Sequence, residues 1–151
     1  MIPKIIHYCW FGRNPLPPLA QECIASWRKY LPDYEIKEWN EDNFDVNIIP
    51  YTAEAYRQKK YAFVSDYARF WILHQFGGIY FDTDVEVIRP MNDIIAAGNF
   101  MGFEIDPDGE NTPGRYAPRY CFSVALRTWF RNGSFTSVSE EDARHICRHE
   151  V

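Results

Sequence analysis

The chain has 151 residues, a formal net charge of −5 and a sequence pI of about 5.3. Its length suits a single domain, and its 46% hydrophobic and 25% charged residues are typical of a soluble globular protein. The acidic balance argues against a nucleic-acid-binding groove, which needs clustered Lys and Arg side chains. Aromatic residues make up 17% of the chain, and such rings fill cores or stack on bases and sugars.

From the sequence we expect neither an export signal nor a membrane-spanning segment. No apolar run approaches the roughly 18 residues of a membrane span. The N-terminus has an early Pro3 and no small-residue cleavage site, so it does not resemble a signal peptide. The four cysteines lack CxxC spacing and are expected to be reduced thiols. We therefore expect a cytoplasmic protein with no transmembrane segment, compatible with peripheral association at a membrane.

The first half of the chain alternates between strand-like and helix-like segments. An apolar, β-rich run predicts a strand at residues 3–11, and Pro18 suits the first turn of a helix that runs to about Tyr30. Residues 34–39 predict a second strand, and residues 52–60 predict a second helix.

Residues 61–76 contain no Gly or Pro and predict a long helix that ends at Gly77-Gly78. At helical spacing, one face carries Val64, Tyr67, Ala68, Trp71 and Gln75, and another carries Ser65, Asp66, Arg69 and Leu73. The apolar residues that follow predict a strand over 79–88, ended by Pro90.

This order of elements predicts an α/β fold with a parallel sheet. Ligands of open α/β sheets bind beyond the carboxyl ends of the strands. Trp10, Asn40 and the segment 82–84 follow or end three of the predicted strands. We expect these three places to converge on one site.

The sequence changes character after Glu104. Residues 106–114 form a turn-rich segment, residues 120–130 are modestly apolar, and a capping box starting at Ser137 predicts a short helix over 140–149. We expect a core domain at residues 1–104, followed at 105–151 by a loop and short helix without an assigned role.

Asp82 and Asp84 are the strongest candidates for chemistry. Side chains two residues apart on a strand share a face, so the predicted strand would place the two carboxylates together. Two hard oxygen ligands suit Mg²⁺ or Mn²⁺, which then binds substrate phosphates. Glu86 would share this face as an exposed rim residue or a further acceptor. A second Asp-x-Asp, at 106–108, lies in the turn-rich segment and is interpreted as loop chemistry.

Asp66 and Arg69 are spaced for an ion pair within the long helix. Two interpretations stay open: an intrahelical ion pair with no further role, or a wall of the acidic site with Ser65 beside it. His145 and His149 also share a helix face, and a solvated face explains them better than a metal site.

Four segments, in this order, resemble glycosyltransferase family 32, whose members carry a DXD sugar-binding region, and are also similar to the catalytic core of large glucosylating toxins. The segments are residues 2–10 (IPKIIHYCW), 31–40 (LPDYEIKEWN), 62–69 (AFVSDYAR) and 77–84 (GGIYFDTD). The resemblance covers about residues 1–104 and implies that they form a GT-A-like, Rossmann-like core that binds a nucleotide sugar. Family members usually continue with another half domain, so we expect a domain shortened at its C-terminus.

The resemblance also implies roles for single residues. Trp10 would stack on the nucleobase. Asp66 and Arg69 would hold the donor sugar and diphosphate, with Ser65 beside them. Asp82 would lie near the ribose and metal, and Asp84 would bind the metal directly. The implied reaction is the transfer of a hexose from a nucleotide sugar to a saccharide acceptor in polysaccharide biosynthesis. It would depend on Mn²⁺ or Mg²⁺ and retain the anomeric configuration. The implied catalytic residues are Asp66, Arg69, Asp82 and Asp84.

Two alternatives stay open from the sequence. One is a nucleotide-sugar-binding protein that is truncated or does not catalyse transfer. The other is a phosphatase of the haloacid dehalogenase type, with Asp82 as nucleophile and Asp84 as acid and base. The phosphatase needs a Lys downstream of this motif, and the last Lys of the chain, Lys60, lies upstream.

Overall fold

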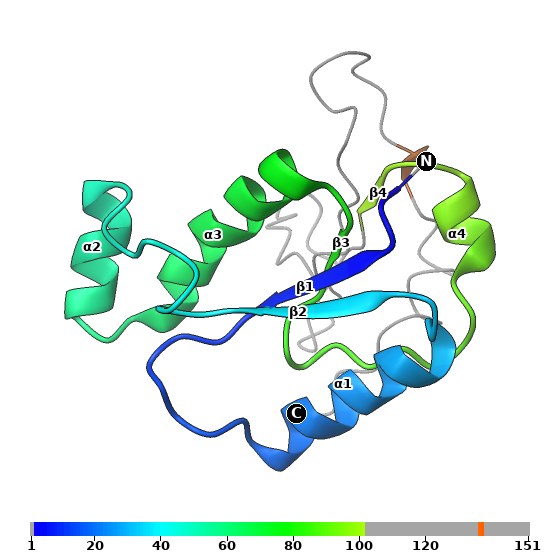
Figure 1. The fold of residues 1–151 in the computed structure, drawn as a ribbon, viewed down its shortest axis with the longest axis horizontal. Helices are drawn as coiled ribbons and strands as arrows, with labels where there is room; N and C mark the ends of the chain where they lie inside the picture. The colour runs from blue at the N-terminus through cyan, green and yellow to red at the C-terminus, as the bar shows by residue number, and fades with distance from the viewer. Residues whose placement is uncertain (1, 102–135, 138–151) are drawn as a thin grey trace, which may run out of the picture.

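A three-stranded parallel sheet forms the centre of the fold (Figure 1). The computed structural model describes residues 2–101, 136 and 137. The strands are β1 (Ile5–Cys9), β2 (Glu35–Trp39) and β3 (Ile79–Tyr80), in the order β2-β1-β3. The predicted α/β class with parallel strands is confirmed, although β1 is shorter than the predicted 3–11.

Helices α1 (Pro18–Tyr30) and α3 (Tyr61–Phe76) have the predicted bounds. Pro18 starts the first helix without losing a hydrogen bond, because the first amide groups of a helix have no partner within it. Gly77 ends α3 with a φ of 65°, a conformation that glycine adopts without strain. Figure 1 shows α1 and α3 on opposite sides of the sheet.

Helix α2 (Pro50–Arg57) begins and ends earlier than the predicted 52–60. Pro50 supplies the start, for the same reason as in α1. Lys59 has a φ of 58°, which interrupts the helical backbone before α3 begins. The short connection therefore separates two helices that the sequence pattern placed almost end to end.

The predicted strand over 79–88 is wrong beyond its first residues. Tyr80 is the last residue of β3, and only the amide of Phe81 continues the ladder, by donating to the carbonyl of His7 at 3.0 Å. The chain then turns at Asp82, whose carbonyl accepts from the amide of Val85 at 3.1 Å. Asp82 and Asp84 therefore lie in a turn rather than on one face of a strand.

Two short elements complete the described structure. Helix α4 covers Asn92–Ala96, and strand β4 (Phe100–Met101) pairs in parallel with β5 (Thr136–Ser137). Neither was predicted, because elements this short show no periodicity. The expected loop at 106–114 and the helix at 140–149 lie outside the described residues.

The hydrophobic core is divided by the sheet. Ile6 and Tyr8 of β1 pack on the α1 side, where Trp27 is fully buried, whereas Cys9 packs on the α3 side against residues such as Ala68. This alternation follows the two-residue period of a strand. The same alternation in β3 places the side chain of Tyr80 on the α3 side and that of Ile79 on the α1 side.

Candidate functional site

Arg69 is the centre of a charged cluster between α3 and the turn after β3. Its side chain is only 9% exposed, and its guanidinium contacts Asp66 at 2.6 Å and Asp82 at 3.2 Å. Its Nε also donates to the carbonyl of Ser65 at 3.3 Å. Asp66 and Arg69 therefore form an intrahelical ion pair, and Arg69 also reaches the acidic turn, as the second interpretation of their spacing expects.

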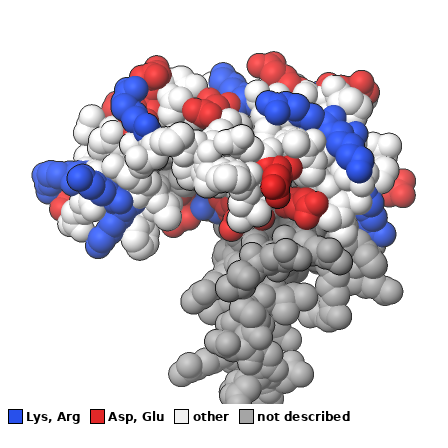
Figure 2. All heavy atoms as spheres, turned by 90° about the horizontal axis from the view of Figure 1, so that it is seen from below, with Lys and Arg blue, Asp and Glu red and all other residues white. Residues whose placement is uncertain are grey.

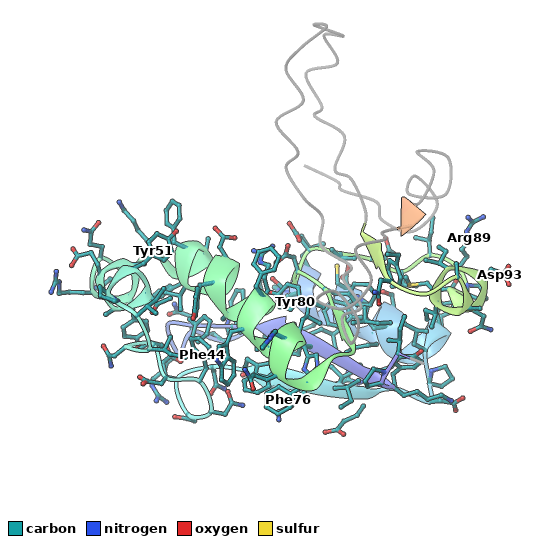
Figure 3. The ribbon with its side chains drawn as sticks, turned by 90° about the horizontal axis from the view of Figure 1, so that it is seen from above. Phe44, Tyr51, Phe76, Tyr80, Arg89 and Asp93 are labelled. Atoms are coloured by element: carbon teal, nitrogen blue, oxygen red, sulfur yellow. The ribbon has the colours of Figure 1, made fainter. Side chains whose placement is uncertain are left out.

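Tyr80 supports this cluster from the last position of β3, next to α3 in Figure 3. Its hydroxyl donates to Asp82 at 3.3 Å, and the Arg69 guanidinium carbon lies 5.3 Å from the centre of its ring. A cation at this distance over an aromatic face is attracted by the ring. Tyr80 thus contacts both members of the Arg69–Asp82 pair.

Burial and charge act in opposite directions on this cluster. Burial raises the pKa of the Asp82 carboxyl and Arg69 opposes that rise, while the neighbouring Asp84 adds to it. Burial is also the largest single influence on Arg69 and disfavours its charge, but Asp82, Tyr80 and Asp66 together outweigh burial and raise the pKa of the guanidinium. The negative charge of Asp82 is therefore maintained mainly by Arg69.

The two carboxylates of the DXD turn have different surroundings. The Asp82 side chain is 29% exposed, whereas Asp84 is exposed. Their charges still interact, since Asp84 raises the pKa of Asp82. Among the residues that the structure describes, no three His, Cys, Asp or Glu side chains form a metal-binding group. Two carboxylates suit a Mg²⁺ or Mn²⁺ ion that takes its remaining ligands from water and phosphates.

Trp10 lies at the same edge of the sheet, directly after β1. Its amide donates to the carbonyl of Trp39 at 2.8 Å, which continues the pairing of β1 with β2. Its ring is half-buried against the α1-side core, and its Nε1 donates to the carbonyl of Asn14 at 2.7 Å. The structure thus brings Trp10, Asn40 and Asp82 to the carboxyl edge, as predicted, with Trp10 packed against the core on the α1 side and Asp82 facing α3.

The loop after Trp10 is tied to the loop after β2. The Glu41 carboxylate accepts from the amide of Gly12 at 2.5 Å and from the Tyr56 hydroxyl at 3.0 Å. Burial would raise the pKa of Glu41, but these hydrogen bonds, one from its own backbone amide and the charge of Arg13 together outweigh burial and lower that pKa. Gly12 has a φ of 97°, and a Cβ there would lie 2.4 Å from the ring of Tyr61. These contacts fix the conformation of the loop that follows Trp10.

The remaining predicted residues have simpler surroundings. Ser65 donates its hydroxyl to the carbonyl of Tyr61 at 3.2 Å, and Glu86 is exposed. His145 and His149 lie outside the described residues. On the face in Figure 2, basic side chains are interspersed with acidic ones over the described part of the chain.

Sequence reasoning missed Tyr80, Glu41 and His7. Tyr80 precedes Asp82 by two positions, so strand periodicity offered a usable signal. His7 is fully buried in β1, and its imidazole contacts Gly77 and Trp39. The sequence shows a histidine within an apolar run, but its burial and its partners, which come from distant segments, are not visible there.

Comparisons with known proteins place the chain among glycosyltransferases. Residues 17–101 match the family described as "Glycosyltransferase sugar-binding region containing DXD motif". An uncharacterized glycosyltransferase of Acanthamoeba polyphaga mimivirus is 33% identical over 107 residues, covering 67% of this chain and 43% of that protein. Inositol phosphoceramide mannosyltransferase 1 of Schizosaccharomyces pombe is 25% identical over 119 residues, covering 72% and 36%.

Two further relatives extend the comparison. The initiation-specific alpha-1,6-mannosyltransferase of Candida albicans is 29% identical over 141 residues, covering 80% of this chain and 37% of that protein. Among solved structures, the PaToxG glycosyltransferase matches with a TM-score of 0.56 at 20% identity, covering 83% and 55%. This likeness supports the GT-A-like fold. The chain spans less than half the length of these curated relatives.

Proposed function

The chain belongs to the glycosyltransferase family with a DXD-containing sugar-binding region, and we propose that it binds a nucleotide sugar through a divalent cation and transfers the sugar to a saccharide-type acceptor. The observation that carries this proposal is the contact of Arg69 with both Asp66 and Asp82, directly beside the DXD turn. Membership in a transferase family also removes the support for the phosphatase alternative.

The residues of the cluster would divide the work as follows. Asp66, whose side chain is 54% exposed, offers carboxylate oxygens to donor-sugar hydroxyls. Arg69 holds Asp66 and Asp82 on either side of its guanidinium and places a fixed positive charge beside the donor diphosphate. Such preorganised charge stabilises a leaving group most where water is excluded. Trp10 would stack on the base, and Ser65 fixes Arg69 through its carbonyl.

Asp82 and Asp84 would hold the cation. Their oxygens are hard ligands, and both belong to the turn that follows a buried strand. When bound, Mn²⁺ or Mg²⁺ would neutralise the diphosphate as the bond between sugar and phosphate breaks. Asp82 is the more constrained ligand, since Arg69 and Tyr80 fix its orientation.

The sugar and acceptor are proposed from the relatives. Two of the relatives named above are mannosyltransferases, so we propose a hexose donor, with a mannose nucleotide as the first to be tested. We further propose retention of the anomeric configuration and a role in polysaccharide biosynthesis. Within the described residues, no helix is both long and apolar enough to cross a membrane. The cytoplasmic localisation stays a prediction.

A donor panel tests the proposed function directly. Release of nucleoside diphosphate from GDP-mannose, UDP-glucose and UDP-galactose is measured with Mn²⁺, with Mg²⁺ and with EDTA, in the presence and absence of oligosaccharide acceptors. We expect one donor to be consumed, only with metal, and faster with an acceptor. Anomeric NMR of the product then reports retention or inversion. Donor-independent hydrolysis of simple phosphate esters would contradict the proposal.

A further inference from the structure

His7 makes two side-chain hydrogen bonds that together allow only one protonation state. The carbonyl of Gly77 can only accept, so the His7 Nε2 at 2.9 Å from it must carry a proton. The Trp39 Nε1–H can only donate, so the His7 Nδ1 at 3.0 Å must be bare. The fully buried ring is therefore the neutral Nε2–H tautomer, with both nitrogen atoms satisfied.

The same residue contacts both ends of β3. At the start of the strand, its imidazole Nε2–H donates to the carbonyl of Gly77, the residue that ends α3. At the end of the strand, its backbone carbonyl accepts from the amide of Phe81 at 3.0 Å, and Phe81 directly precedes Asp82. Between these contacts, His7 is the register partner of Tyr80. One residue thus fixes both the entry and the exit of the strand that leads to Asp82.

The turn between α3 and β3 leaves little room for another arrangement. Gly78 has a φ of 94°, and a Cβ placed on it would lie 2.6 Å from the carbonyl oxygen of Ile5 and 3.1 Å from Nε2 of His7. The backbone of this turn therefore passes directly over β1 and the imidazole. The His7 ring therefore acts on this turn in two ways: the backbone of Gly78 packs against it, and its Nε2–H donates a hydrogen bond to Gly77.

From these contacts we infer that His7 is a positioning residue for the donor site: it fixes the Gly77-to-Phe81 segment and thereby sets the 3.2 Å contact between Arg69 on α3 and Asp82 after β3. The inference rests on the proposed function for its catalytic meaning. Trp39 takes part by holding the ring in its tautomer from β2.

Two substitutions separate positioning from general stability. His7→Gln places an amide donor close to the position of Nε2, so it keeps the bond to Gly77. His7→Asn places its polar group close to Nδ1, so it keeps a partner for Trp39 but does not reach Gly77. Both remove a buried aromatic ring and both lower the melting temperature. Only His7→Asn is expected to displace the turn that carries Asp82.

The experiment uses the 151-residue chain and three measurements. Nitrogen-15 NMR of the wild type at pH 7 should show His7 as the Nε2–H tautomer. The Arg69 Nε–H resonance should stay in place in His7→Gln and move in His7→Asn. Calorimetry with Mn²⁺ and GDP or UDP should give an affinity within about threefold of wild type for His7→Gln and at least about tenfold weaker for His7→Asn, a difference that corresponds to about 1.4 kcal/mol for each factor of ten.

Each outcome decides the inference. A charged ring or an Nδ1–H tautomer at pH 7 overturns it, as does an Arg69 resonance that behaves identically in the two variants. If His7→Asn does not fold, the tautomer and the His7→Gln resonance still decide the matter. If the wild type binds neither nucleotide, the proposed function fails, while the two NMR readouts still test whether His7 sets the Arg69–Asp82 contact.

Discussion

The guanidinium of Arg69 lies 3.2 Å from the carboxylate of Asp82, which joins helix α3 to the turn after β3. This contact crosses from a helix face to the carboxyl edge of the sheet, where ligands of α/β folds bind. It places a buried positive charge beside a carboxylate whose pKa is raised by burial. The donor site proposed for this chain depends on that pair.

Replacing Arg69 with lysine should weaken donor binding even though the positive charge is kept. Arg69→Lys keeps the charge, but it cannot contact Asp66, Asp82 and the Ser65 carbonyl together, because lysine lacks the planar fork. We expect nucleoside diphosphate affinity to fall by about tenfold or more, as for the loss of a charge-assisted hydrogen bond. Calorimetry at a fixed Mn²⁺ concentration measures this affinity. Affinity equal to wild type would show that the guanidinium geometry is not needed.

Tyr80→Phe tests the hydrogen bond that Tyr80 donates to Asp82 of the Arg69–Asp82 pair. The variant removes the hydroxyl that donates to Asp82 but leaves the ring below Arg69. One lost hydrogen bond should lower the free energy of unfolding by about 1 kcal/mol. Urea denaturation reports this change. Tyr56→Phe is a matched control, since its hydroxyl donates to Glu41 outside the Arg69 cluster. A Tyr80 variant that loses no more metal-dependent affinity than this control would contradict the assigned role.

Trp10 should report nucleotide binding by fluorescence. If its ring stacks on the base, nucleotide quenches part of the emission, and Trp10→Ala abolishes that part and weakens binding by about 1–3 kcal/mol. The half-buried ring also packs against the α1-side core, so the variant should lower stability as well. Trp10→Phe keeps most of this packing and serves as the control. Quenching that persists in Trp10→Ala would assign stacking to another residue.

His7 should make the protein less stable at mildly acidic pH. Burial lowers its pKa from 6.5 to about 4, against the hydrogen bond to Gly77, and the nearby charge of Lys37 lowers it further. Between these values the unfolded chain binds more protons, so stability is full above pH 6.5 and falls as pH falls toward 4. The full loss is about 3 kcal/mol.

Urea titrations between pH 4 and 8 test this expectation. The carboxyl groups contribute in the same acid range: Asp82 has a raised pKa and Glu41 a lowered one, so their contributions have opposite signs. The difference between wild type and His7→Gln isolates the histidine. An equal slope of stability with pH in the two proteins would show that His7 does not titrate on unfolding.

The sequence predicted those parts of the fold that local signals determine. Pro18 and Gly77 mark helix ends by their backbone preferences, and both helices have the expected bounds. The strand at 79–88 failed for a physical reason. Val85 and Val87 are buried in the α1-side core, so the apolar alternation is real, but their burial comes from packing and not from sheet pairing.

The candidate site was predictable in part. The spacing of Asp66 and Arg69 indicated their ion pair. The Asp-x-Asp spacing after an apolar run, together with the family resemblance, selected Asp82 and Asp84, although they lie in a turn and not on a strand. The contact between Arg69 and Asp82 needed the fold, because it depends on how α3 and β3 are joined. The partners of His7 were hidden for the same reason: Gly77 and Trp39 are distant in sequence and meet only across the sheet.

Metal-dependent nucleotide binding by wild type and Asp84→Asn tests the central claim most directly. Asp84 is exposed in the turn, so the neutral isostere should leave the fold intact while removing one metal ligand charge. Calorimetry with GDP and UDP, with Mn²⁺ and with EDTA, should show wild-type binding that requires Mn²⁺. Asp84→Asn should lose at least about tenfold in that affinity. Asp93→Asn, which changes an exposed carboxylate on α4, should bind as wild type does. Wild-type binding unaffected by EDTA, or Asp84→Asn binding equal to wild type with Mn²⁺, would contradict the account.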